Sequence, residues 1–343
     1  MRALRVYTAG AGRGPELADV PEPSADGGDL LVESLVLGVC GTDREIAEHG
    51  LPAAPPGRDW AVLGHESLGR VLEAPAGSGF TPGDLVVGIV RRPDPVPCRF
   101  CATQRPDLCE NGRYTERGIK GLDGFGAERF TLAPEYAVRV AADLGRAAVL
   151  VEPASVAVKA WEQADHAAGR PAERVLVLGA GPIGLLCALL GVQRGLEVHV
   201  VDRVESGPKP RQTKALGAAY RTRTQDLTGG FDRVLECTGT LLEEAIGLTA
   251  PAGAACLVGG GDPRSSAALN AGALSQELLA WNKALIGTVN ASRGHFRTAH
   301  TLLRAADHTW LEGLLTQSVP VEAWPTALSP SPEAIKSIIH FHG

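Results

Sequence analysis

The stretch Arg174-Val-Leu-Val-Leu-Gly-Ala-Gly-Pro-Ile-Gly184 decides the fold of this chain. Its apolar run, residues 175–178, predicts a strand buried on both faces, and residues 183–194 predict a helix directly after it. Glycines fill the turn between the two elements with the G-x-G-x-x-G spacing of dinucleotide-binding turns. The stretch therefore predicts one strand–turn–helix unit of a parallel α/β sheet.

The residues of this turn suit a pyrophosphate. Gly179 permits the tight turn, Gly181 lets backbone N–H groups approach the phosphates, and Gly184 lets the helix pack closely on the strand. Pro182 and Ile183 begin the helix, whose N-terminus supplies partial positive charge. We predict that these five residues contact a dinucleotide. The alternative is a turn of the same shape that binds nothing.

A carboxylate at the end of the next predicted strand, residues 197–201, bears on the choice of cofactor. Asp202 would accept hydrogen bonds from both ribose hydroxyls and would repel a 2′-phosphate, which favours NAD. Arg203 could instead fold over a 2′-phosphate. We therefore expect NAD as the preferred cofactor, with NADP possible.

A second part of the cofactor site is predicted after a later strand, residues 233–236. Cys237, Thr238 and Gly239 follow its C-terminal end, where doubly wound sheets bind ligands. We expect backbone groups there to meet the carboxamide end of the nicotinamide. The alternative is that Cys237 is only a small buried residue.

The pattern of the chain changes near residue 150. Before it, short β-patterned runs alternate with Pro- and Gly-rich loops, at residues 30–37, 69–73, 84–90 and 136–140. After it, strands and helices alternate as far as an extended run at residues 254–258. The segment beyond Gly287 is too short for a third domain and is expected to complete the first. We predict an α/β protein with a β-rich domain (1–157 and 290–343) and a doubly wound parallel-sheet nucleotide-binding domain (158–289).

Composition narrows the classes of function. The 343 residues carry a net charge of −6 and 44% are hydrophobic, which describes an ordinary globular chain without a strongly basic surface for nucleic acid. No apolar segment follows Arg2 and Arg5, and glycines interrupt the longest uncharged stretch, residues 175–192. We expect a cytoplasmic protein that binds neither nucleic acid nor membrane, in which clustered cysteines serve metal binding or catalysis.

Cys40 and His65 each lie beside glycines in loops just after β-patterned runs. With Glu152 they supply the S, N and O donors that zinc accepts. Glu66 follows His65 directly, so both side chains reach one metal only if the chain turns there. Asp43 is suited to accept the free N–H of His65 and to fix its tautomer. A structural role for each lone Cys or His is the alternative.

A second cluster has the spacing Cys98-x2-Cys101-x7-Cys109. Three cysteines so close together in a reducing compartment predict a structural zinc, which requires a fourth ligand. Asp94 is the nearest upstream candidate. A disulfide, or a zinc ribbon that binds nucleic acid, is the alternative, and the acidic charge balance disfavours the ribbon.

Together these motifs resemble the zinc-dependent medium-chain alcohol dehydrogenases, and among them the archaeal-type glucose 1-dehydrogenase branch. The similar stretches span nearly the whole chain: Cys40-Gly-Thr-Asp-Arg-Glu-Ile46, Leu63-Gly-His-Glu66, Arg105-Pro-Asp-Leu-Cys109, Gly118-Ile119 with Asp123-Gly-Phe125, Gly179 to Gly184, and Val289-Asn290 with His295-Phe296. The resemblance implies a GroES-like β-rich catalytic domain, a Rossmann domain, zinc, NAD or NADP, and a sugar or polyol substrate.

The resemblance also implies roles for individual residues. Cys40, His65 and Glu152 look like the ligands of the catalytic zinc, with Glu66 as an outer or exchanging ligand. Thr42 corresponds to the hydroxyl that takes the substrate proton. With Asp43 and Glu66, it completes the predicted catalytic residues.

Further residues match the substrate and cofactor positions of the family. Glu116, Asn290 and His295 fall where such enzymes contact sugar hydroxyls or the cofactor. Val289, beside Asn290, is implied to contact the cofactor. The family further suggests a homodimer or homotetramer formed through the nucleotide-binding domain.

Two positions depart from the family pattern. In the family, the segment that corresponds to Cys98, Cys101 and Cys109, here called the structural lobe, begins with a further cysteine. Pro95 stands at that position, which leaves Asp94 as the substitute ligand. Val90 stands before Arg91 and Arg92, where the archaeal glucose enzymes carry an Asn that helps to hold the sugar. Loss of a polar contact can redirect specificity. The alternatives to a glucose-type enzyme are therefore a biosynthetic dehydrogenase of a cyclitol, aminocyclitol or nucleoside sugar, and a non-catalytic nucleotide-binding protein.

Overall fold

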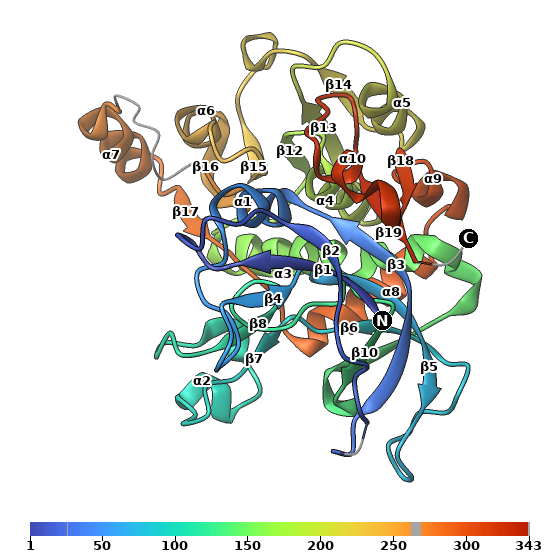
Figure 1. Ribbon diagram of the computed structural model, residues 1–343. Helices are drawn as coiled ribbons and strands as arrows, with labels where there is room; N and C mark the ends of the chain where they lie inside the picture. The colour runs from blue at the N-terminus through green and yellow to red at the C-terminus, as the bar shows by residue number, and fades with distance from the viewer. Residues whose placement is uncertain (26, 262–268, 342–343) are drawn as a thin grey trace. The chain divides into compact units, whose positions relative to one another are not determined.

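The computed structural model describes residues 1–25, 27–261 and 269–341, and shows an α/β protein made of two compact units (Figure 1). The first unit comprises Met1–Glu152, Asn290–Ser331 and Lys336–Gly343, and the second comprises Pro153–Val289 and Pro332–Ile335. The second unit is thus inserted into the first along the chain. The contacts within each unit put the first boundary at Glu152, slightly before the boundary at 157 expected from the sequence.

A seven-stranded sheet organises the first unit, with the order β11-β6-β5-β3-β19-β18 and β10 paired to β3. Its strands are β3 (Leu30–Val39), β5 (Glu66–Glu73), β6 (Leu85–Gly88), β10 (Arg129–Leu132), β11 (Ala137–Val140), β18 (Gln317–Pro320) and β19 (Ser337–His340). All four β-patterned runs predicted from the sequence are strands of this sheet. In β3, Gly38 pairs with Glu66 on one side and with Ile338 on the other. The end of β3 therefore lies beside the start of β5 and next to a strand from the C-terminal segment.

Smaller elements surround this sheet. Two three-stranded sheets contain β1 (Arg2–Tyr7), β2 (Glu16–Asp19) and β4 (Trp60–Val62), and β7 (Arg91–Arg92), β8 (Thr115–Arg117) and β9 (Gly121–Leu122). The α-helices are α1 (Gly41–His49), α2 (Arg99–Ala102), α8 (Arg293–Arg304), α9 (His308–Glu312) and α10 (Trp324–Leu328). The 3-10 segments are η1 (Pro106–Leu108), η2 (Pro134–Tyr136), η3 (Ala142–Leu150) and η5 (Val321–Ala323).

The core of the first unit follows from the period-two pattern of its strands. Leu30 and Val32 alternate with less buried neighbours at the start of β3 and are fully buried. Phe125 and Phe130 pack in the same core with ring centroids 4.8 Å apart. This packing fixes the strand ends on which the first candidate site is built.

The second unit is a six-stranded parallel sheet with the order β14-β13-β12-β15-β16-β17. Its strands are β12 (Arg174–Leu178), β13 (Glu197–Val201), β14 (Ala219–Arg221), β15 (Phe231–Glu236), β16 (Thr249–Leu257) and β17 (Ala284–Gly287). Its helices are α3 (Val151–Ala167), which begins in the first unit, α4 (Pro182–Gln193), α5 (Pro208–Ala215), α6 (Leu242–Leu248) and α7 (Ala271–Ala280), with the 3-10 segment η4 (Thr224–Asp226). The predicted glycine turn joins β12 to α4, as expected.

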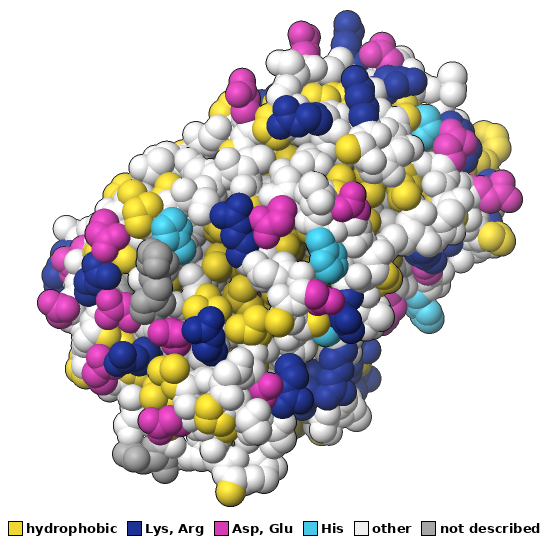
Figure 2. Space-filling view, turned by 90° about the vertical axis from the view of Figure 1, so that its right-hand side faces the viewer, with side chains coloured by type: hydrophobic (Ala, Val, Ile, Leu, Met, Phe, Trp, Pro, Cys, Tyr) yellow, Lys and Arg dark blue, Asp and Glu magenta, His cyan; other side chains and the backbone are white. Residues whose placement is uncertain are grey.

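The surface is mixed in charge. On the face drawn in Figure 2, Lys and Arg side chains lie among Asp and Glu side chains over much of the surface. Within the described ranges, no helix combines the length and the apolar character needed to cross a bilayer.

Candidate active site

Cys40 follows the last residue of β3 and caps the N-terminus of α1. Its Sγ accepts a hydrogen bond from the Thr42 amide at 3.2 Å, and its own amide donates to Asp43 Oδ2 at 2.9 Å. His65 lies just before β5, with Nε2 3.1 Å from Cys40 Sγ. Its Nδ1 lies 3.1 Å from Asp43 Oδ1, which is the contact that the sequence predicted for Asp43. A cation bound at Nε2 would therefore meet a ring whose other nitrogen is already held.

The electrostatics of this cluster suit a cation. Burial alone would raise the pKa of Asp43, but the His65 ring, the Cys40 amide and Lys336 together outweigh it, and the pKa is lowered. Burial lowers the pKa of His65, but Asp43 and Cys40 outweigh burial and raise that pKa well above its ordinary value. The cluster attracts a proton to His65, and a metal ion would replace this charge.

Glu66 completes the compact group. Its carboxylate, Cys40 Sγ and a His65 ring nitrogen all lie within 4.8 Å of one another. The adjacent side chains of His65 and Glu66 thus reach the same place, and Gly64 directly before them adopts a positive φ of +98°. A Cβ at Gly38 would overlap the Glu66 carboxylate, which explains the glycine on the facing strand.

Lys336 makes an ion pair with Glu66, which sequence reasoning missed. Its side chain is fully buried, and its Nζ also donates to the carbonyl of Val39 at 3.0 Å. Lys336 thus contacts both the residue before Cys40 and the residue after His65. Because it is far from both in sequence, only the pairing of β19 with β3 could have revealed it.

Glu152 lies at the start of α3, buried to 8% exposure and outside the group formed by Cys40, His65 and Glu66. Burial raises the pKa of Glu152 to about 7, with His65 opposing and Glu66 adding to the effect. A buried carboxyl with a raised pKa beside a Cys–His pair fits a zinc site, because zinc would compensate the negative charge. The residues therefore fit the zinc that the family implies.

A polar cluster in the same unit contains two of the predicted substrate residues. Arg91 Nη2 and Nε lie 2.9 and 3.0 Å from Glu116 Oε1, and the Arg91 side chain is 5% exposed. Asn290 Nδ2 donates to the same oxygen at 2.8 Å and adopts a positive φ of +60°. The ring of Tyr114 lies 3.8 Å from the Arg91 guanidinium carbon. The Glu116 carboxylate is therefore held in one orientation, with Arg91 as a partner that the sequence did not indicate.

His295 lies in the first turn of α8 and takes part in its N-terminal cap. Its Nδ1 accepts from the Ser292 amide at 2.9 Å, and its own amide donates to Ser292 Oγ at 3.4 Å. The structure therefore gives His295 a capping role, and its contact with a sugar stays a prediction.

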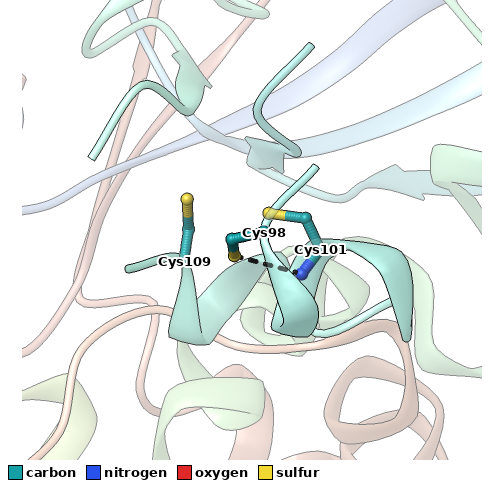
Figure 3. A group of neighbouring side chains, drawn as sticks. All are labelled: Cys98, Cys101 and Cys109. Carbon is teal, nitrogen blue, oxygen red and sulfur yellow. Dashed lines mark hydrogen bonds between the residues drawn. The ribbon is translucent and has the colours of Figure 1, made fainter. Parts of the chain in front are cut away.

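The three clustered cysteines form a second donor group (Figure 3). Cys98 is the N-cap of α2, Cys101 lies within this helix, and Cys109 follows η1. The three sulfurs lie within 4.8 Å of one another. The Cys101 amide lowers the pKa of the Cys98 thiol to about 7, whereas burial raises that of Cys101 to about 11. All seven cysteines are free thiols, so the structure does not contain the alternative disulfide.

Asp94, the predicted fourth ligand, is used differently in the structure. Its carboxylate accepts hydrogen bonds from the Val96 amide at 2.8 Å, from Asn111 Nδ2 at 2.8 Å and from Arg113 Nε at 3.0 Å. These contacts join the start of the lobe to its end. The donor group therefore consists of three thiols, and Asp94 lies outside it because its oxygens are hydrogen-bonded elsewhere.

The glycine turn of the second unit has the geometry of a phosphate-binding turn. Gly179 adopts φ of +101°, and its amide donates to the Val201 carbonyl at 2.7 Å. Gly181 is the N-cap of α4 and makes no side-chain cap, and Pro182 and Ile183 form the first turn. A Cβ at Gly184 would overlap the carbonyl of Gly179. The uncapped N-terminus is suited to bind a pyrophosphate.

Asp202 lies beside this turn, as predicted, but it is already engaged. Its Oδ2 accepts from the Ala180 amide at 2.8 Å and from Lys209 Nζ at 3.1 Å, and its Oδ1 accepts from the Val204 amide at 3.1 Å. Arg203 is exposed. The sequence did not identify Lys209, although its place seven residues after Asp202 and next to two prolines was a signal.

The predicted nicotinamide loop is held by a carboxylate that sequence reasoning missed. Glu236, which is 1% exposed, accepts from the amides of Thr238 at 2.8 Å and Gly239 at 2.9 Å. These two N–H groups are therefore engaged within the loop. A hydrogen bond with Cys187, together with burial, raises the pKa of Cys237. Val289 is 62% exposed, and its carbonyl accepts from Lys159 Nζ at 2.9 Å.

A zinc-type donor set and a dinucleotide turn in one chain define a nicotinamide-dependent oxidoreductase. Residues 26–142 match the family described as "Alcohol dehydrogenase GroES-like domain", and residues 145–341 match "Glucose dehydrogenase C-terminus". The chain therefore belongs to the zinc-dependent medium-chain alcohol dehydrogenase family, in its glucose dehydrogenase branch.

Individual relatives agree with this assignment. The chain is 38% identical to a glucose 1-dehydrogenase of Methanocella arvoryzae over 94% of both chains, and 36% identical to one of Thermoproteus tenax over 99% of both. A solved structure of Haloferax mediterranei glucose dehydrogenase, in complex with NADP, zinc and gluconolactone, is 31% identical, covers 100% of both chains and gives a TM-score of 0.90. The protein is an NAD(P)-dependent zinc oxidoreductase.

Proposed function

We propose that the protein oxidises the C1 hydroxyl of an aldose, as a glucose 1-dehydrogenase does. The observation that carries this proposal is the Glu116 carboxylate, which Arg91 and Asn290 hold in one orientation in the unit that also contains Cys40 and His65. A fixed carboxylate is suited to accept hydrogen bonds from sugar hydroxyls. The gluconolactone in the Haloferax structure supports the same substrate class.

The metal residues of the proposal are Cys40, His65 and Glu152, with Glu66 as an outer or exchanging ligand. Zinc held there would supply a Lewis acid for the substrate oxygen. Asp43 holds Nδ1 of His65, which would leave Nε2 for the cation. The compact placement of Glu66 with Cys40 and His65 supports its exchange with Glu152.

Separate groups of residues are proposed for the proton and hydride steps. Thr42, in the first turn of α1, is proposed to accept the proton of the substrate hydroxyl and pass it outward. A nicotinamide cofactor bound here would supply the hydride acceptor. The residues proposed to hold it are the glycine turn of the second unit, Cys237 to Gly239, Val289 and Asn290. We also propose that residues 1–157 and 290–343 form the catalytic domain and that residues 158–289, inserted between them in the chain, form the nucleotide-binding domain.

The cysteine lobe is proposed to bind a structural zinc through Cys98, Cys101 and Cys109. Asp94 then stabilises the structural lobe, because its hydrogen bonds with Asn111 and Arg113 connect the two ends of the lobe.

A second candidate substrate is a cyclitol, aminocyclitol or nucleoside sugar. Val90 favours it, because this apolar side chain, 2% exposed, offers no hydrogen bond where the archaeal glucose enzymes are expected to carry an Asn. We also propose a homodimer or homotetramer formed through the second unit, in a reducing, cytoplasmic environment that keeps the cysteines free.

A spectrophotometric screen tests the function directly. Aldoses, polyols and cyclitols are each supplied with NAD and with NADP, and reduction of the cofactor is followed. We expect glucose or another aldose to reduce the cofactor, and Cys40→Ser to lose both zinc and activity. Inert aldoses with an active cyclitol would select the second candidate, whereas nucleotide binding without any turnover would indicate a non-catalytic binding protein.

A further inference from the structure

The charge beside the adenosine ribose position is set by two residues. Asp202 alone would repel a 2′-phosphate. In the structure, however, Lys209 Nζ lies 3.1 Å from Asp202 Oδ2, and the two side chains are 12% and 11% exposed. The ammonium group offsets the negative charge, so the repulsion on which a preference for NAD depends is largely removed.

The same contact limits how Asp202 can bind a ribose. Each carboxylate oxygen has two acceptor positions. Both positions of Oδ2 are used, by the Ala180 amide and Lys209, and one position of Oδ1 is used by the Val204 amide. One acceptor position is therefore left for the two ribose hydroxyls. Binding of both hydroxyls would compete with the contact to Lys209, whereas a 2′-phosphate could share this cation.

Lys209 is held in place by the local backbone. Pro208 and Pro210 flank it in the first turn of α5, and each proline fixes its own φ. Tyr220 donates to the carbonyls of Asp202 at 3.1 Å and of Val204 at 2.5 Å, which fixes the loop facing Lys209. The ammonium group is thus positioned before a ligand arrives.

We propose that Lys209 is a specificity-determining residue that lets this site accept the 2′-phosphate of NADP, with the exposed Arg203 as a second cationic contact. The inference rests on the proposed dinucleotide site. It assigns acceptance of NADP to a cation that neutralises Asp202, with the carboxylate itself retained.

Isothermal titration calorimetry on the full-length protein tests the assignment, with 2′,5′-ADP and 5′-AMP as probes. These probes share the adenosine and the 5′-monophosphate and differ only in the 2′-phosphate, and they require neither sugar nor turnover. The wild type is expected to bind 2′,5′-ADP at least as tightly as 5′-AMP. Lys209→Met should weaken 2′,5′-ADP roughly tenfold and should leave 5′-AMP unchanged or bound more tightly, because Asp202 is then free for the ribose.

Two further variants keep the test decisive. Lys209→Arg should retain binding of 2′,5′-ADP because the positive charge stays, and Lys214→Met, in the last turn of the same helix, should change neither affinity. If Lys209→Met fails to fold, Lys209→Arg and Asp202→Asn provide the comparison, and Asp202→Asn should favour 2′,5′-ADP further. Equal weakening of both probes, or no change in their ratio across the Lys209 and Asp202 variants, overturns the assignment. Binding of 5′-AMP but not of 2′,5′-ADP by the wild type also overturns it, and binding of neither contradicts the dinucleotide site itself.

Discussion

Lys336 and Glu66 form an ion pair whose side chains are only 0% and 3% exposed. Lys336 Nζ also donates to the Val39 carbonyl at 3.0 Å. The pair therefore ties a C-terminal strand to the two segments that carry Cys40 and His65. Each charge is tolerated in the interior because the other compensates it.

Removal of the cation should leave a buried, uncompensated carboxylate. We expect Lys336→Met to lower the free energy of unfolding by about 3 kcal/mol, because breaking a buried pair from one side is strongly destabilising. Urea unfolding followed by circular dichroism measures the change. The double variant Lys336→Met/Glu66→Gln should recover a large part of the loss, and a double variant as unstable as the single one would show that the pair does not act as described.

The acidity of Glu152 gives the metal-free protein a pH-dependent stability. Its pKa is raised to about 7 in the folded state, above the ordinary value of 4.5, so the folded state binds more protons between these two values. Stability should therefore fall as pH rises through this window. His65, whose pKa is also raised, acts in the same direction above pH 6.5. Thermal melts after chelation should show this fall.

Glu152→Gln isolates the contribution of the carboxyl. It should reduce the fall in melting temperature between pH 5 and pH 7 by roughly 2 to 5 °C, because the amide does not ionise. Wild type and variant with the same pH dependence would contradict the assignment. Addition of zinc should abolish most of the difference, since a bound cation stabilises the ionised carboxylate.

Much of the fold was predictable because its signals are local. Three features depend only on neighbouring residues: the glycine turn, the strands at residues 30–37 and 175–178, and the alternation of strands with helices in the parallel-sheet unit. Helix α3 was missed because Pro153 obscures its start, although Ala154, Ala157, Ala160 and Ala164 form a fully buried stripe at helical spacing. That stripe is the signal that could have found it.

The parts of the sites that escaped prediction are the partners supplied by distant segments. Arg91 meets Glu116 through the pairing of β7 with β8, and Lys336 meets Glu66 through the place of β19 beside β3. Nothing in the local sequence distinguishes these cations from exposed ones. Asp94 is the opposite case. Its position near the cysteines in the sequence suggested a zinc ligand, but in the folded lobe its carboxylate oxygens accept hydrogen bonds.

A third prediction concerns the structural lobe and distinguishes its proposed zinc ligands, the cysteines, from Asp94, which only makes hydrogen bonds. Cys109→Ser should lower the zinc content from about two ions per chain to about one, because it removes a thiolate from a group of three. Asp94→Asn should keep about two zinc ions. It should lower the melting temperature, because it weakens only the ion pair with Arg113. Metal analysis by mass spectrometry and thermal melts measure both. Loss of zinc in Asp94→Asn would identify Asp94 as a ligand after all.

The second unit supplies a fourth prediction, about self-association. β17 is an edge strand of the parallel sheet, and the apolar side chains of Leu279 and Trp281, beside it in the chain, are 69% and 50% exposed. An unpaired strand edge next to exposed apolar side chains is a favourable surface for a second copy of the chain. Trp281→Glu combined with Leu279→Glu should therefore shift the molar mass from that of the proposed dimer or tetramer toward that of the monomer, measured by light scattering over a range of concentrations. Val96→Glu, which alters a side chain that is 66% exposed in the first unit, is the matched control and should leave the mass unchanged. An unchanged mass in the double variant would place the interface elsewhere, since two buried carboxylates without partners cannot be accommodated at an apolar contact.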